Sequence, residues 1–206
     1  MKKYIIRSFQ LFILLVIRLM FIGRVKIVIA PASSKISGPV VIAANHASGF
    51  DPFVLGCFLP VKTFLRVFPF SFMTANIFYH RLWKPLAWLA GCYPAKQASE
   101  RNPKHSYGVG YSIKSFYEGF SVMMFPEGKR TKSPHEAKPG VSWILNETKA
   151  SLLLCHIEWS SSGWLKTANI GYKMAGKHEA ASPEAIMKAV YNLPVEHKVM
   201  LAENEA

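Results

Sequence analysis

The sequence predicts an α/β fold with a mixed, mostly parallel sheet flanked by helices, together with an N-terminal membrane-associated helix. Short apolar runs such as 40–44 and 122–125 alternate with segments that carry helix start and stop signals. Runs that are apolar at every position are typical of strands buried on both faces of a parallel sheet. A chain of 206 residues suits one such core. We therefore predict a basic amphipathic helix and lead-in over 1–30, followed by one domain over 31–206.

The N-terminal segment 4–22 is mostly apolar, but its uninterrupted apolar run covers only 11–17. That run is shorter than the roughly 20 residues that cross a bilayer. A secretory signal is a weaker alternative, because the candidate cleavage site at 30–32 lies beyond Arg18, Arg24 and Lys26. We predict a helix that lies in the cytoplasmic leaflet, with its arginines reaching lipid phosphates; the alternative is a helix packed on its own domain. The residues expected among the acyl chains are Phe9, Phe12, Leu15, Leu19 and Phe21.

The first half of the domain is predicted to start with a strand over 40–44 and a helix that begins at Asp51-Pro52 and runs through 53–59. The aromatic stretch 61–90 is interrupted by Pro69 and Pro85, which favours two or more short helices. A short strand is expected over 91–96. A polar loop is expected over 97–105.

The second half of the domain is predicted to alternate again between helices and strands. A helix over 107–117 is expected to close at Gly119. The sequence Ser182-Pro183 predicts the start of a last helix that ends near Asn192. The strands expected between these helices cover 121–125, 151–157 and 165–172.

Composition and charge narrow the possible partners. Lys and Arg outnumber Asp and Glu by 25 to 12, which gives a formal charge of +13. Such a charge attracts phospholipid headgroups, nucleotide phosphates, an acidic carrier protein or nucleic acid. The sequence has no helix-turn-helix, zinc-finger or RNP-type motif, and its 14 Phe, 8 Tyr and 5 Trp suit a membrane-facing protein. We therefore expect membrane phospholipids as partners, no nucleic acid, and a location on the cytoplasmic face of the cell membrane.

Three cysteines, Cys57, Cys92 and Cys155, stand far apart and form no C-x-x-C pair. This pattern argues against a disulfide framework and against a cysteine-based zinc site. We expect the cysteines to pack in the core, and we expect no bound metal.

The first candidate for chemistry is the pair formed by His46 and Asp51, the only aspartate in the sequence. A carboxylate five residues from a histidine can orient the imidazole and stabilise its charged form, so that the histidine acts as a base. The alternative is structural, because an aspartate before Pro52 can simply cap a helix. Either way, the pair follows a predicted strand, at the edge of the sheet where functional loops gather.

The second candidate is the run 125–132, which directly follows another predicted strand. Gly128 allows a tight turn with close approach of the backbone to a ligand, and Lys129, Arg130 and Lys132 offer cationic donors to a phosphate. Glu127 can brace a cation or accept a hydrogen bond from a substrate hydroxyl. A solvated basic loop is the alternative.

Together the two runs resemble the glycerolipid acyltransferase family, of the 1-acylglycerol-3-phosphate acyltransferase (PlsC) type. Residues 45–51 match its N-H-x-S-x-x-D block, which contains the HX4D motif, and residues 125–130 match its F-P-E-G-x-R block. The likeness covers about 40–157. Two positions depart from the family pattern: Lys96 stands where an arginine is usual, and His156 stands near a usual proline.

The resemblance implies an enzyme that transfers a fatty acyl group from acyl-CoA or acyl carrier protein to a hydroxyl of a lysophospholipid-type acceptor. The acceptor favoured by the resemblance is 1-acylglycerol-3-phosphate, which would give phosphatidic acid. His46 would be the general base and Asp51 its orienting partner, with no cofactor beyond the acyl donor. The sequence has no G-x-S-x-G elbow, so direct transfer is expected. The residues expected to bind substrate are Asn45, Lys96, Glu127, Gly128 and Arg130.

Two alternatives to this function stay open. The acceptor can be another lyso-lipid or an aminolipid. The protein can also be a non-catalytic membrane lipid-binding protein on the same fold.

Overall fold

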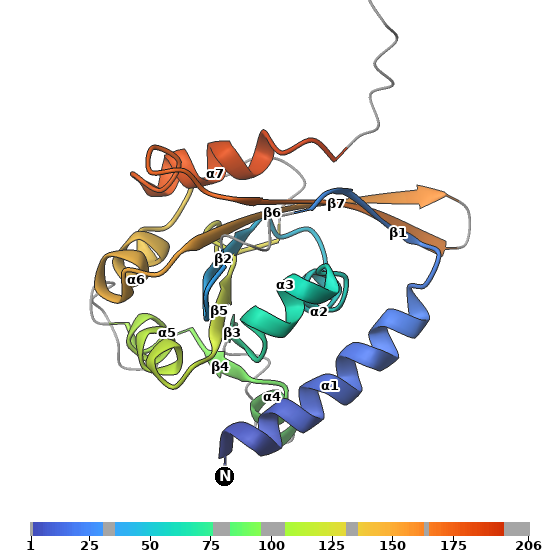
Figure 1. The fold of residues 1–206 in the computed structure, drawn as a ribbon, viewed down its shortest axis with the longest axis horizontal. Coiled ribbons are helices and arrows are strands. Elements are labelled where there is room, and N and C mark those ends of the chain that lie inside the picture. Colours follow the sequence, from blue (N-terminus) through green and yellow to red (C-terminus); the bar gives the residue numbers. More distant parts are fainter. Residues whose placement is uncertain are drawn as a thin grey trace, which may run out of the picture.

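The computed structural model of the chain describes residues 2–30, 36–75, 83–95, 106–130, 136–162 and 165–195. The strands in this part of the chain are β1 (Val25–Ile29), β2 (Val41–Ala44), β3 (Phe70–Thr74), β4 (Cys92–Pro94), β5 (Ser121–Met124), β6 (Leu152–Ser162) and β7 (Leu165–Met174). They form one seven-stranded sheet in the order β1-β7-β6-β2-β5-β3-β4 (Figure 1). Neighbouring strands run parallel except β6 and β7, which are antiparallel. The predicted mixed, mostly parallel sheet is confirmed.

Helices cover both faces of the sheet. They are α1 (Lys2–Met20), α2 (Asp51–Cys57), α3 (Val61–Val67), α4 (Lys84–Leu89), α5 (Tyr107–Tyr117), α6 (Gly140–Thr148) and α7 (Pro183–Tyr191). In Figure 1, α1, α2 and α3 lie on one side of β6 and β7, and α7 lies on the other. The predicted helix over 107–117 is confirmed, as is the last helix, where the Ser182 hydroxyl accepts a hydrogen bond from the Ala185 amide at 3.1 Å.

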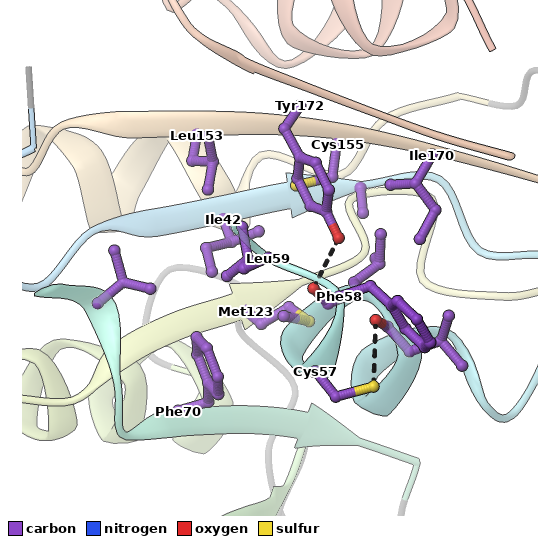
Figure 2. Packing of buried hydrophobic residues seen from close by; sticks show 14 of the residues in the cluster. Ile42, Cys57, Phe58, Leu59, Phe70, Met123, Leu153, Cys155, Ile170 and Tyr172 are labelled. Carbon is purple, nitrogen blue, oxygen red and sulfur yellow. Dashed lines mark hydrogen bonds between the residues drawn. The ribbon is translucent and has the colours of Figure 1, made fainter. Parts of the chain in front are cut away.

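The centre of the sheet is β2, which is buried at all four positions. Its side chains alternate between two apolar clusters, with Ile42 and Ala44 facing α1, α2 and α3, and Val41 and Ala43 facing α6 and α7. Figure 2 shows the first cluster, where the Tyr172 hydroxyl donates a 2.8 Å hydrogen bond to the Leu55 carbonyl of α2. Strand β2 is thus held rigidly from both faces, and so is the start of the loop that follows it.

The stretch 61–90 differs from its prediction in one element. Helices α3 and α4 confirm two short helices, but residues Phe70–Thr74 between them form β3. This strand pairs with β5 and β4, and Phe70 and Phe72 are buried in the first cluster. Burial of both faces hides the alternation that would reveal a strand in the sequence. The predicted polar loop over 97–105 lies outside the described residues.

Helix α1 packs along the domain through a buried stripe, Ile6, Gln10, Leu14 and Ile17. Gln10 lies within this stripe, and its side-chain amide donates to the carbonyls of Phe70 at 2.6 Å and Ala90 at 2.8 Å. Its side-chain oxygen accepts from the Phe70 amide at 3.1 Å. In the structure this helix packs on its own domain, and its predicted association with the membrane stays a prediction.

Two arginines of α1 also have partners in the domain, and their predicted contact with lipid phosphates stays a prediction. Arg18 donates to the Cys57 carbonyl at 2.6 Å and lies over the Phe58 ring at 5.4 Å. Arg7 lies over the Phe68 ring at 5.5 Å. A carbonyl group and two aromatic rings next to the helix are thus partners of these arginines.

The outer face of α1 is apolar and exposed. Of the side chains predicted to face acyl chains, Phe12, Leu15 and Leu19 are exposed, and Phe9 is half-buried. Phe21 is buried, because it follows the end of the helix and packs against Phe50 and Trp159. In the part of the chain that the structure describes, no helix is both long and apolar enough to traverse a bilayer.

Candidate active site

Three adjacent parallel strands, β6, β2 and β5, bring the two candidate motifs together. The loop that carries His46 leaves the carboxyl end of β2, and the loop that carries Glu127 leaves the carboxyl end of β5. Strand β6 lies on the other side of β2 and extends beyond it toward Trp159. Because these strands point the same way, their ends meet at one edge of the sheet.

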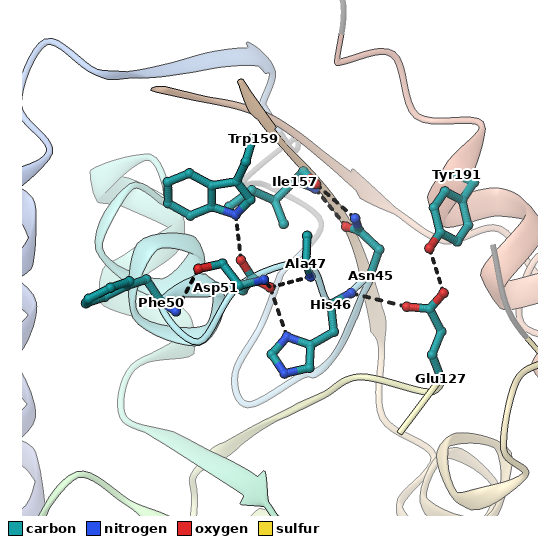
Figure 3. Close-up of polar contacts among 10 residues, drawn as sticks. Asn45, His46, Ala47, Phe50, Asp51, Glu127, Ile157, Trp159 and Tyr191 are labelled. Atoms are coloured by element: carbon teal, nitrogen blue, oxygen red, sulfur yellow. Dashed lines mark hydrogen bonds and ion pairs between the residues drawn. The ribbon is translucent and has the colours of Figure 1, made fainter. Parts of the chain in front are cut away.

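His46 and Asp51 face each other at this edge. The distance from His46 Nδ1 to Asp51 Oδ2 is 2.9 Å (Figure 3). The Asp51 side chain is fully buried, whereas 21% of the His46 side chain is exposed. A carboxylate only accepts hydrogen bonds, so Nδ1 carries the proton and the lone pair of Nε2 is left for another partner. This is the arrangement of a general base with its orienting carboxylate.

Within the part of the chain that the structure describes, Asp51 receives four N–H donors. Besides His46, its Oδ2 accepts from the amides of Ala47 and Ser48 at 2.7 Å each, and its Oδ1 accepts from Trp159 Nε1 at 2.7 Å. Both oxygens of this buried carboxyl group therefore have hydrogen-bond donors. The buried charge is therefore matched by hydrogen bonds, as a buried carboxylate requires.

The alternative role of Asp51 as a helix cap is wrong. Helix α2 begins at Asp51 itself, Phe50 occupies the N-cap position, and no side chain caps this helix end. The carboxylate instead binds amides that precede the helix. The backbone of the His46 loop thus wraps around the carboxylate, which ties the position of the histidine to it.

Glu127 connects the second motif to the first. Its side chain is buried; Oε2 accepts from the His46 amide at 3.2 Å, and Oε1 accepts from the Tyr191 hydroxyl at 2.6 Å. Next to it, the Phe125 ring stacks on the imidazole of His46, with ring centroids 4.2 Å apart. Both oxygens of Glu127 are thus engaged within the protein, and its predicted contact with substrate stays a prediction.

The rest of the second loop is open and basic. Gly128 has φ +67°, a conformation that favours glycine, and it is exposed, as are Lys129 and Arg130. Arg130 reaches back to the first loop, where its Nη1 lies 3.9 Å from the place a Cβ on Gly49 would take. Lys138 Nζ lies 2.5 Å from the corresponding point on Gly128. The structure therefore gathers cations beside the two loops.

The other two residues predicted to bind substrate are Asn45 and Lys96. Asn45 is buried, and its side-chain amide exchanges two 2.8 Å hydrogen bonds with the backbone of Ile157. These bonds hold the His46 loop against β6, so the structure shows a positioning role for Asn45. Lys96 lies outside the described residues.

His156, which stands near a usual proline of the family, lies on the α7 side of the sheet. Its Nδ1 donates to the Leu193 carbonyl at 3.1 Å, and its ring meets the ring of Tyr191 edge to face at 5.3 Å. Burial lowers the pKa of His156. Burial and the hydrogen bond to Glu127 raise the pKa of Tyr191, so this phenol keeps its proton for Glu127.

The cysteines take no part in the site. All three are free, and burial raises the pKa of Cys57 and of Cys92 to about 12, so their reactive thiolate forms are suppressed. Among the described residues, no group of three or more His, Cys, Asp or Glu side chains is placed to hold a metal ion.

Sequence comparison decides the family. The family model described as "Acyltransferase" matches residues 24–158, which is more than half of the chain. The chain belongs to this acyltransferase family. The predicted resemblance to the glycerolipid acyltransferases is confirmed, and the protein is an acyltransferase. No curated protein matches the sequence.

The fold of this acyltransferase is similar to that of a solved enzyme. The crystal structure of the 1-acyl-sn-glycerophosphate (LPA) acyltransferase PlsC from Thermotoga maritima matches with a TM-score of 0.58 and 15% sequence identity. The match covers 92% of this chain and 76% of that one. At this identity the likeness concerns the fold.

Two residues of the site, Trp159 and Tyr191, belong to neither sequence motif. They lie 108 and 64 positions from the carboxylates they bind. Trp159 lies one residue beyond the segment that the family model matches. A signal for Trp159 exists in the alternation of β6, because a residue two positions after Ile157 lies on the same face of the strand.

Proposed function

We propose that this acyltransferase is a membrane-associated enzyme that transfers a fatty acyl group from acyl-CoA or acyl carrier protein to the free hydroxyl of a lysophospholipid. The favoured acceptor is 1-acylglycerol-3-phosphate, and the product is then phosphatidic acid. The observation that supports this most strongly is the dyad, in which a fully buried Asp51 holds Nδ1 of His46 at 2.9 Å. That contact leaves Nε2 for the acceptor.

In the proposed reaction, Nε2 of His46 takes the proton of the acceptor hydroxyl as its oxygen attacks the thioester carbonyl carbon. A C–O bond forms and the carbonyl electrons move to oxygen. When the carbonyl is restored, the C–S bond breaks, and the imidazolium returns its proton to the leaving thiolate. Asp51 stabilises the imidazolium between these two steps. The protein itself is unchanged, and no acyl-enzyme forms.

The acceptor headgroup is assigned to the basic loop that follows β5. The guanidinium of Arg130 can bind a phosphate through two parallel hydrogen bonds, and it lies next to Gly49 in the histidine loop. An excess of 13 positive charges favours a substrate and a surface that are anionic. The structurally similar PlsC enzyme is a lysophosphatidate acyltransferase, which supports an acceptor of the same class here.

Membrane association is assigned to the outer face of α1. Ser8, Phe12, Leu15 and Leu19 follow one another at helical spacing along this exposed face. Because the opposite stripe is buried in the domain, the helix can lie at a lipid surface while it stays attached to the fold. Such an enzyme meets its acceptor where the lipid resides.

The activity is tested by product identification. Detergent-purified protein is incubated with acyl-CoA or acyl carrier protein donors against lysophosphatidate, other lysophospholipids and lyso-aminolipids, and the products are identified by mass. We expect phosphatidic acid as the product. The rate of its formation should fall by a factor of at least about 10³ in His46→Ala. It should be unchanged in His178→Ala, which alters an exposed histidine. Turnover retained by His46→Ala would refute the base assignment. Lipid binding without product from any pair would favour a non-catalytic protein.

Membrane binding is tested by flotation with vesicles of anionic phospholipid. Leu15→Glu is expected to weaken binding more than Ser8→Glu does, because both add one negative charge to the same face of α1 but only the first removes an apolar side chain. Equal binding by the two variants would remove this face from the membrane contact.

A further inference from the structure

Among the described residues that hydrogen-bond to Asp51, Trp159 is the one that comes from neither candidate motif. Its indole Nε1 donates to Oδ1 of Asp51 at 2.7 Å, whereas the other three donors, among them His46, converge on Oδ2. Each carboxylate oxygen is therefore fixed from its own side. Without the indole, Oδ1 has no partner in this set, and rotation about the Cβ–Cγ bond of Asp51 is held from one side only.

The tryptophan is itself firmly placed. It lies two residues after Ile157 on β6, and Ile157 is joined to the histidine loop by the two hydrogen bonds of Asn45. Its ring is half-buried and meets the edge of Phe21, with ring centroids 5.6 Å apart. The indole N–H is thus aimed at Asp51 by the strand, by the Asn45 clamp and by the chain after α1 (Figure 3).

Packing alone does not require an indole at this place. A phenyl ring would fill much of the same space, but it has no donor for a buried anion. A hydrogen bond to an ionised group is about twice as strong as one between neutral groups, and losing it from a buried charge is correspondingly more damaging. The geometry therefore indicates a function in the alignment of Asp51.

We propose that Trp159 is a positioning residue of the acyl-transfer reaction, which fixes the carboxylate of Asp51 so that Nδ1 of His46 stays aligned while the imidazolium forms. It acts through Asp51 and touches neither substrate. This inference rests on the base and orienter assignments proposed above.

The first test compares Trp159→Phe with Trp143→Phe, which alters a half-buried tryptophan in α6 on the other face of the sheet. We expect Trp159→Phe to lower kcat by about 10- to 100-fold, the loss typical of a hydrogen bond to a buried charge, with the KM values of donor and acceptor within about twofold of wild type. Trp143→Phe should keep the wild-type kcat. A kcat of Trp159→Phe within about twofold of wild type would overturn the proposal.

A double-mutant cycle separates positioning from a general loss of structure. In Asp51→Asn the new amide must turn its NH₂ group either toward Trp159 or toward the amides of Ala47 and Ser48, so a donor faces a donor. Adding Trp159→Phe removes one of these conflicts. We therefore expect no further loss of kcat, and a higher melting temperature, in the double variant than in Asp51→Asn. Equal fractional losses of kcat in both backgrounds would show a merely structural tryptophan and overturn the proposal.

If Trp159→Phe does not fold, Trp159→benzothienylalanine provides the same comparison, because its sulfur replaces the N–H group in a ring of nearly equal size. The expected and refuting values of kcat are those given for Trp159→Phe. Failure of the underlying assignment gives a different pattern, since His46→Ala would then retain turnover whatever residue stands at position 159.

Discussion

Replacing Gln10 by leucine tests whether α1 is an integral part of the fold. The side chain of Gln10 makes three hydrogen bonds with the backbone of Phe70 and Ala90, and only 3% of the residue is exposed. Leucine leaves these three backbone groups without these partners, at about 1–2 kcal/mol each. Burial of the leucine side chain returns about 1–2 kcal/mol. We expect the free energy of unfolding to fall by about 2–4 kcal/mol, a large part of the stability of a typical domain.

The sign of the change makes this experiment decisive. A helix that left the domain to lie in a bilayer would gain from the same substitution, because leucine enters hydrocarbon more favourably than glutamine. The assay is urea unfolding in detergent micelles, followed by tryptophan fluorescence. The control is Leu11→Gln at the neighbouring exposed position, with an expected change below about 0.5 kcal/mol. An unfolding free energy of Gln10→Leu equal to or above that of wild type would refute the packing described for α1.

Two further predictions concern the basic loop and His156. Arg130→Ala should raise the KM of a phosphate-bearing acceptor by about tenfold or more with little change in kcat, and Arg130→Lys should recover part of that loss; an unchanged KM in steady-state kinetics would exclude Arg130 from the headgroup site. Burial lowers the pKa of His156 in the folded protein below its value of about 6.5 in the unfolded chain. The unfolded chain therefore binds a proton more readily, so the free energy of unfolding is highest above a pH of about 6.5 and falls as the pH is lowered through this value. His156→Asn keeps a donor for the Leu193 carbonyl but does not titrate in this range. Its melting temperature should therefore fall less than that of the wild type between about pH 7 and pH 5, and equal falls would contradict the prediction.

The parts of the fold that the sequence predicts correctly are those with local signals. Apolar runs mark β2 and β5, and a serine before the first helical turn marks α5 and α7, where Ser106 and Ser182 accept hydrogen bonds from the helix amides. Helix α6 has no such signal and is absent from the prediction, since Pro139 stands at its N-cap without a side-chain bond. Strand β1, at the edge of the sheet, lies in the segment that the sequence predicts to be helix and lead-in, although four of its five residues are β-branched.

The contacts of the site that the sequence predicts are likewise the local ones. His46 and Asp51 are five residues apart, so the sequence itself places them in one loop. The pairing of Glu127 with Tyr191, and of Asp51 with Trp159, depends on which strands and helices become neighbours. The interpretation of Asp51 as a helix cap fails for a local reason, because an Asp-Pro pair suits both the cap and the first turn, and only the backbone geometry distinguishes them.

The side chain of Asn45 has a consequence for how the chain that carries His46 leaves the sheet. Strand β2 pairs with β6 up to Ala44 and Cys155, and one residue later the Asn45 amide takes over that pairing by binding both polar groups of the Ile157 backbone. The Asn45 side chain makes the two hydrogen bonds that a backbone peptide group would make in the sheet. The main chain can therefore turn away from β6 while the two strands stay hydrogen-bonded. The amide of His46, released from the sheet, can then bind Glu127. One asparagine at the end of β2 thus allows the loop after β2 to contact the loop after β5.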